Sequence, residues 1–201
     1  IQHLQAESLE ILTLTLEETN ETCIYEFNGF FKELCKFPIL RRLKFRQRVQ
    51  FNDEISMKLE HVENLDLYQL GAPMVCSLIN LGKIQHFHYH FPHDGNSAYY
   101  NQVFKLVAHM VSLQTLSLVA PRGMKLPLDP ECMETFLLSI QKLMKLYHIK
   151  AVFDNLSTTL EQILDYLKHY LYHRRFRIVS IRSAEHLVIR LQSMLYEIEV
   201  W

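Results

Sequence analysis

The chain has 201 residues, of which 49% are apolar and 21% charged, and its 21 Lys and Arg against 22 Asp and Glu leave a formal net charge of −1. This apolar content excludes an intrinsically disordered chain, and the charge balance excludes a general polyanion binder. No apolar run approaches the ~18 residues of a membrane span, so no membrane partner is expected.

The four cysteines stand at positions 23, 35, 76 and 132, with no C-x-x-C pair. Such spacing is typical of free thiols in a reducing compartment, so we expect an intracellular protein, cytoplasmic or nuclear. The chain begins at Ile1 rather than Met, and no linker composition interrupts it. Residues 1–201 are therefore expected to form a single domain and to be a fragment of a longer protein.

A six-residue pattern, L-x-x-L-x-L, recurs in chain order and predicts one strand at each copy. The copies are Leu9–Leu14, Leu40–Phe45, Val62–Leu67, Ile84–Tyr89, Leu113–Leu118 and Leu146–Ala151, followed by a degraded copy around Phe176 and Ile178. Their centres are 22 to 33 residues apart. One match in a Leu-rich chain means little, but six ordered matches at similar spacing indicate a structural repeat.

Apolar residues at helical spacing fill the segments between these copies. Three of these segments have apolar residues at the same intervals and start after Asp129, Ser157 and Ser183, which are plausible helix caps. This predicts helices over about 130–144, 157–171 and 184–195. Weaker patterns predict helices over about 26–36, 73–82 and 98–111, and the alternation of Tyr196 to Trp201 predicts a last strand. Strands and helices therefore alternate along the whole chain.

This alternation and the L-x-x-L-x-L copies resemble the leucine-rich repeats, and among them the irregular, helix-containing repeats of F-box/leucine-rich-repeat proteins. The resemblance implies an α/β fold: a horseshoe-shaped solenoid of about seven to eight repeats, with a parallel sheet on the concave side and helices on the convex side. It also implies substrate recognition in a cullin-type ubiquitin ligase. The Asn or Cys that usually follows the strand is not evident, and residues 1–201 contain no F-box.

In a parallel stack the leucines point into the core, and the residues between them face the concave surface. This projected surface is mostly basic, with Asp66 as its one acidic residue, and it is the expected partner-binding site. Its residues are Arg42, Lys44, Arg46, Asn64, Asp66, Tyr68, His86, His88, His90, Thr115, Ser117, His148, Lys150, Arg175 and Arg177. Arginine forks match carboxylate and phosphate geometry, which favours an acidic or phosphorylated protein partner. Nucleic-acid binding and ordinary solvation of exposed charge are the alternatives.

His86, His88 and His90 alternate along one predicted strand and share one face. Three imidazoles there could bind zinc, with Asp66 nearby, or could form a cationic patch below pH 6.5. A polar strand face without further function is the third interpretation. We expect these histidines to lie side by side, without a metal.

Motifs of enzymes are absent: the sequence has no G-x-S-x-G, G-x-x-x-x-G-K, G-x-G-x-x-G or H-E-x-x-H. We therefore expect no catalytic residue, no cofactor and no small-molecule substrate. The loops at 91–97 and 120–130 leave the ends of strands, where binding loops are common. The sequence thus predicts a protein-interaction module that uses its concave face and these loops.

Overall fold

The computed structural model describes residues 9–14, 33–45, 58–68, 72–92, 97–119, 130–152, 176–181, 186–191 and 196–200, and the single residues 165 and 169. The strands are β1 (Ile11–Leu14), β2 (Arg42–Phe45), β3 (Asn64–Tyr68), β4 (His86–His90), β5 (Thr115–Val119), β6 (His148–Val152), β7 (Phe176–Ile181), β8 (His186–Leu191) and β9 (Tyr196–Val200). The helices are α2 (Ala72–Leu78), α3 (Ser97–Val107) and α4 (Pro130–Gln141), with a 3₁₀ turn, η1, at Leu81–Lys83.

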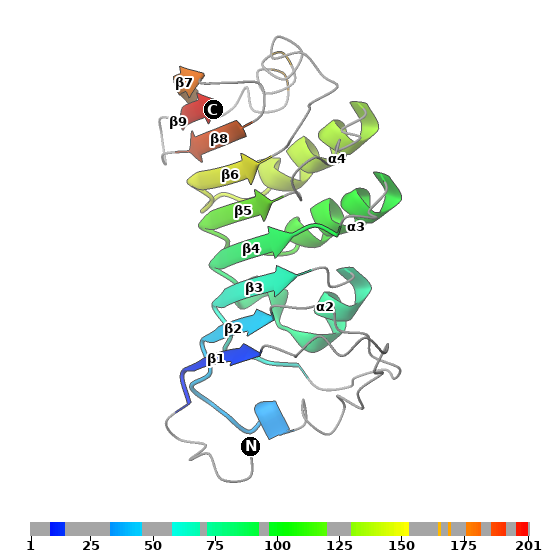
Figure 1. The fold of residues 1–201 in the computed structure, drawn as a ribbon, viewed down its shortest axis with the longest axis vertical. Coiled ribbons are helices and arrows are strands. Elements are labelled where there is room, and N and C mark those ends of the chain that lie inside the picture. Colours follow the sequence, from blue (N-terminus) through cyan, green and yellow to red (C-terminus); the bar gives the residue numbers. More distant parts are fainter. Residues whose placement is uncertain are drawn as a thin grey trace.

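The described strands form one sheet in the order β1-β2-β3-β4-β5-β6-β8-β9-β7. The first six are parallel and follow the chain order, which Figure 1 shows as a row of arrows from β1 to β6. Each coincides with one L-x-x-L-x-L copy, so the six predicted strands and their parallel pairing are confirmed. The fold belongs to the α/β class.

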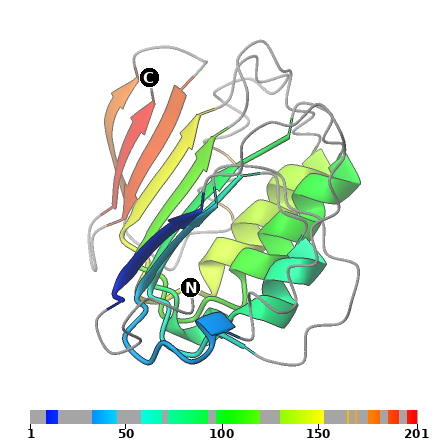
Figure 2. The same cartoon turned by 60° about the horizontal axis from the view of Figure 1, so that its bottom comes forward.

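Helices α2, α3 and α4 all cover the same face of this parallel sheet (Figure 2). Parallel strands need crossover connections, and a helix is the usual one because it can bury its apolar stripe on the sheet. The stripe of α3 is buried at Val103, Phe104 and Val107, which are 0% exposed. The helices therefore supply one half of the core, and the opposite face of β1 to β6 carries no helix from the described residues.

The strand residues that face the helices form the other half of the core. Strands β3, β4 and β5 each alternate between half-buried and buried side chains, as their sequence alternation predicts. The predicted core residues Leu65, Leu67, Leu116, Leu118 and Ile149 are at most 2% exposed, and Tyr89 also points inward. The register that separates the core face from the open face is therefore confirmed.

A backbone hydrogen-bond ladder repeats along the edge where these strands begin. In each step, the carbonyl of the residue just before one strand accepts two N–H groups at the start of the next strand, with N···O distances of 2.7 to 3.2 Å. The accepting carbonyls belong to Glu10, Arg41, Glu63, Gln85 and Gln114. Because each acceptor occupies the same place relative to its strand, the six parallel strands are stacked with one constant register.

The C-terminal part departs from the predicted alternation. The segment predicted as a helix over 184–195 contains strand β8, which pairs antiparallel with β6. Its apolar residues fit helical spacing, but the run Leu187-Val188-Ile189 is equally typical of a buried strand, and β-branched residues favour that state. The helix prediction was wrong because a short apolar run does not distinguish the two structures.

The order of the last strands also differs from the prediction. Strand β7, predicted as the seventh parallel neighbour of β6, lies at the far edge and pairs in parallel with β9. The predicted last strand was expected to pair at the open edge of the sheet or to cover it, but β9 lies between β8 and β7. The parallel stacking therefore ends at β6, because its next neighbour in the sheet is the antiparallel strand β8.

Other predictions fall wholly or mostly outside the described residues. These concern the helix over 157–171 with its expected core residue Leu164, most of the helix over 26–36, and most of both loops. The weaker helix predictions over 73–82 and 98–111 match α2 with η1, and α3. Within the described ranges, no helix has the length and apolar character needed to cross a lipid bilayer.

Candidate binding face of the sheet

The open face of the parallel sheet presents its side chains in two rows that run across the strands. The strand register aligns the first row as Ile11, Arg42, Asn64, His86, Thr115 and His148. The second row, two residues further along each strand, is Thr13, Lys44, Asp66, His88, Ser117 and Lys150. All are half-buried or exposed, so the predicted surface residues of β2 to β6 lie on one face.

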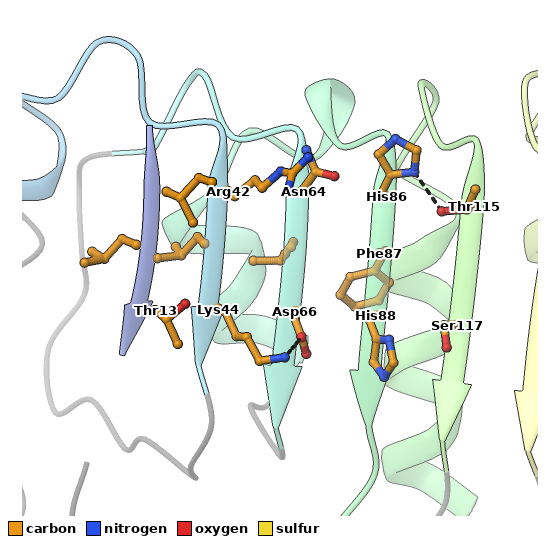
Figure 3. A pocket seen from close by; sticks show the side chains of 14 residues that line it. Thr13, Arg42, Lys44, Asn64, Asp66, His86, Phe87, His88, Thr115 and Ser117 are labelled. Carbon is orange, nitrogen blue, oxygen red and sulfur yellow. Dashed lines mark hydrogen bonds and ion pairs between the residues drawn. The ribbon is translucent and has the colours of Figure 1, made fainter. Parts of the chain in front are cut away.

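An open pocket of about 350 Å³ lies on this face, across β1 to β5. Both rows contribute to its lining from β1 through β5 (Figure 3). Four strand spacings of ~4.8 Å give a length of about 19 Å, which fits about five to six residues of an extended peptide. The pocket is therefore open and long enough to hold a short chain segment.

Lys44 and Asp66 form an ion pair across β2 and β3, in the second row (Figure 3). Their side chains are 33% and 21% exposed, so the pair is partly shielded from solvent. The face was expected to be basic with Asp66 as a minor exception. Instead, Asp66 neutralises the nearest lysine, and within the described part of β1 to β3 the positive charge left on this face is that of Arg42.

Arg42 is exposed and extends toward Asn64 on β3, as Figure 3 shows. No ion pair of Arg42 occurs among the described residues. Its in-register neighbours in the first row are Ile11 on β1 and Asn64 on β3, and neither side chain carries a charge. The guanidinium thus stands at the pocket wall with its donors available to an anion.

The three histidines of β4 do not act as one cluster. His86 Nδ1 lies 2.8 Å from the Thr115 hydroxyl oxygen on β5, so this imidazole is engaged across the first row. His88 and His90 instead stack on each other, with ring centroids 4.4 Å apart, and Tyr68 stacks on His90 at 3.8 Å. The prediction that all three share one face is confirmed, but their environments separate His86 from the other two.

His88 and His90 share their end of the strand with Asp66. One potential ligand atom of each of these three residues lies within 4.8 Å of the other two. The zinc interpretation of the sequence named His86 as the third ligand, but in the structure Asp66 accompanies His88 and His90 instead. The signal for this grouping is present in the sequence. Asp66 and His88 occupy the same position in consecutive L-x-x-L-x-L copies, and stacked repeats bring such positions together.

Burial is the main cause of a lowered pKa at both imidazoles. At His90, burial and the neighbouring His88 lower the pKa to about 4. At His88, burial lowers the pKa, Asp66 opposes this effect, and Lys44 and Lys150 add to it. Both rings are therefore neutral at pH 7, and at these two positions a cationic patch would form only at a lower pH than for an ordinary imidazole.

The remaining predicted site residues are dispersed or undescribed. His148 and Lys150 continue the two rows on β6. Arg46 and Arg175 lie outside the described residues, and Arg177 lies on β7, which β8 and β9 separate from β6. The grouping of Arg177 with Lys150 on neighbouring strands was therefore wrong, because β7 does not follow β6 in the sheet.

Three of the four cysteines are described, and all three are free thiols, as predicted. Burial raises the pKa of Cys35, with a further contribution from Glu60, and burial also raises the pKa of Cys76 against the effect of Lys58. A thiol with a raised pKa is a poor nucleophile at neutral pH. These two cysteines thus lack the activation that a catalytic thiol requires.

Comparison with known proteins adds no identification. The chain matches no protein-family model, no curated protein and no solved structure.

Proposed function

We propose that this chain is a protein-interaction module that binds an extended acidic or phosphorylated segment across the open face of β1 to β5. The observation that carries the proposal is Arg42, an exposed guanidinium at the wall of a long open pocket, with no ion pair among the described residues. A carboxylate or phosphate accepts two parallel hydrogen bonds from such a group. Asn64 and His86 continue the polar row that a bound segment would follow.

The proposed fold is a leucine-rich-repeat solenoid with this face as its concave side. The buried L-x-x-L-x-L positions and the recurrent backbone ladder support it, since both repeat once per strand–helix unit. The antiparallel pairing of β8 would then mark the end of the repeats, where a solenoid needs a different capping structure. An intracellular location is part of the proposal and rests on the free thiols.

Substrate recognition in a cullin-type ubiquitin ligase is the more specific proposal, and it rests on the resemblance alone. Nucleic-acid binding has less support than a protein partner. It needs several free cations, but Lys44 is paired with Asp66, and His88 and His90 are neutral at pH 7. With Lys44 neutralised and Lys150 as the remaining cation of the second row, the face favours a partner with few, well-placed anionic groups.

Selection from a random peptide library tests the proposal, because the partner does not have to be identified beforehand. Peptides rich in Asp, Glu or phosphoserine should be enriched on the wild-type chain. Arg42→Glu should abolish their binding, whereas Lys105→Glu should not, because Lys105 is exposed on α3, on the opposite side of the sheet. Equal loss with both variants would indicate a non-specific charge effect and would contradict the proposal.

A further inference from the structure

A cluster of potential metal ligands lies in the middle of the second row, at Asp66 and His88, and includes His90 two residues further along β4. Asp66 on β3 pairs in register with His88 on β4, and Tyr68 pairs with His90. The alternation of both strands puts Asp66, His88 and His90 on the open face. One carboxylate oxygen and one nitrogen of each imidazole lie within 4.8 Å of one another.

Two buried polar atoms in this cluster lack hydrogen-bond partners. They are Asp66 Oδ1 and His88 Nε2, and the described residues contain one further such atom, Asn101 Oδ1 on α3. A buried polar atom without a partner is destabilising, so such atoms need an explanation, and a bound ion is one of the few. Here the two atoms belong to adjacent residues of one cluster, which a single ion would satisfy together.

The geometry points to a site for one divalent first-row transition ion, such as Zn²⁺, held by the Asp66 carboxylate and the imidazoles of His88 and His90. Two imidazole nitrogens and one carboxylate oxygen are ligands that Zn²⁺ and its neighbours accept. Metal–ligand distances of about 2.0–2.1 Å place tetrahedral ligand atoms about 3.3 Å apart. The ligand atoms must therefore move closer together than they are now. Side-chain rotation can achieve this without backbone movement, because β3 and β4 are already adjacent.

The protonation state of the cluster suits a cation. A metal ligand must be deprotonated, and both imidazoles are neutral at pH 7 because burial lowers their pKa. Stacking of Tyr68 on His90, with an interplanar angle of 12°, restricts the orientation of that ring. Binding then needs no loss of a proton from either ring, although side chains must rotate to bring the ligand atoms together.

Two lysines oppose the binding of a cation. Lys44 is paired with the Asp66 carboxylate through Oδ2, which leaves Oδ1 for the ion. Lys150 on β6 is exposed, so solvent screens its charge. Lys44 should therefore weaken metal binding, and its removal provides a test in which affinity rises.

Three protein ligands leave a coordination position open. Asp66 and His88 also line the pocket, so the metal site adjoins the space in which the proposed acidic segment would lie. The metal site is nevertheless independent of the proposed function, because it is defined by the binding of the ion alone.

Isothermal titration of the full chain, freed of metal by a chelator, with ZnCl₂ tests the site. One ion per chain should bind, and Asp66→Asn and His88→Asn should each weaken binding by roughly tenfold or more. His86→Asn is the matched control, since it removes an imidazole of the same strand that lies outside the cluster, and it should leave the affinity unchanged. Lys44→Met should increase the affinity.

A Co²⁺ titration separates this site from a cysteine site elsewhere in the chain. The wild-type complex should show ligand-field bands without a sulfur-to-metal charge-transfer band. Should Asp66→Asn fail to fold, the increase in affinity with Lys44→Met still tests the assignment. Absence of saturation at one ion per chain, a thiolate band, or an equal loss with His86→Asn and His88→Asn would overturn it.

Discussion

Lys44 on β2 donates a hydrogen bond to the Asp66 carboxylate on β3, and this ion pair divides the open face of the sheet into two parts. In the first row, Arg42 keeps its charge available. In the second row, Lys44 is neutralised by Asp66, whose Oδ1 has no hydrogen-bond partner and whose carboxylate lies close to His88 and His90. The same pair therefore favours an anion beside the first row and a cation beside the second.

Breaking this ion pair should destabilise the fold. Lys44→Gln leaves the partly buried Asp66 carboxylate without its cation, and the free energy of unfolding should fall by about 1–3 kcal/mol. Asp66→Asn added to Lys44→Gln should recover part of that loss. Denaturant unfolding of the two single variants and the double variant measures the coupling, and strictly additive effects would show that the pair contributes nothing to stability.

The core register predicts opposite effects for two neighbouring residues of β5. Leu116 is 1% exposed under the helices, so Leu116→Ala should cost about 2–5 kcal/mol of unfolding free energy. Ser117 points to the open face, and Ser117→Ala should change stability by less than about 0.5 kcal/mol. Chemical denaturation of both variants measures the two losses of unfolding free energy. A larger loss with Ser117→Ala than with Leu116→Ala would show that the assignment of the core face is wrong.

The first six strands could be predicted from the sequence because each carries the same short signal. Leu43, Leu65 and Leu116 stand at one position of the pattern, and stacking alone converts that repetition into parallel pairing. The last three strands could not be predicted in this way. Val188 and Ile189 fit both a helix stripe and a strand, and the choice is made by the unpaired edge of β6, a tertiary feature with no local signature.

The candidate site was predictable as a face but not as a set of contacts. Alternation alone places Arg42, Asp66 and His88 on the open side. The sequence does not show that Lys44 reaches Asp66 or that His86 turns to Thr115, since these depend on side-chain rotation across strands 22 and 29 residues apart. Nor does it show how strongly burial lowers the pKa of His90.

Acid should destabilise the metal-free chain through His90. Its pKa is 6.5 in the unfolded chain and about 4 in the folded one, so between these values the unfolded state binds more protons. The free energy of unfolding should therefore fall as the pH falls from 6.5 to 4, by about 1–2 kcal/mol once solvent screening of this half-buried ring is allowed for. His90→Gln should lose less stability than wild type over this window. Unfolding in a buffer with chelator measures the difference, and parallel pH profiles would contradict the assignment.

Alkylation should be slow at the described cysteines. Burial raises the pKa of Cys35 and Cys76, which reduces their thiolate fractions, and Cys132 is fully buried. Iodoacetamide at pH 7.5, followed by mass spectrometry of peptides, should modify all three more slowly than a free cysteine peptide. Addition of denaturant should remove the difference in rate. A cysteine that is alkylated faster than the free peptide would indicate an activated thiol and would contradict the prediction.

The central claim is that the open face of β1 to β5 binds the partner. Backbone NMR of the ¹⁵N-labelled chain, titrated with an acidic peptide selected on it, tests this most directly. We predict that the largest amide perturbations occur at Arg42, Asn64, His86 and Thr115, and that they disappear with Arg42→Glu. Perturbations concentrated on α3 and α4 instead would contradict the account.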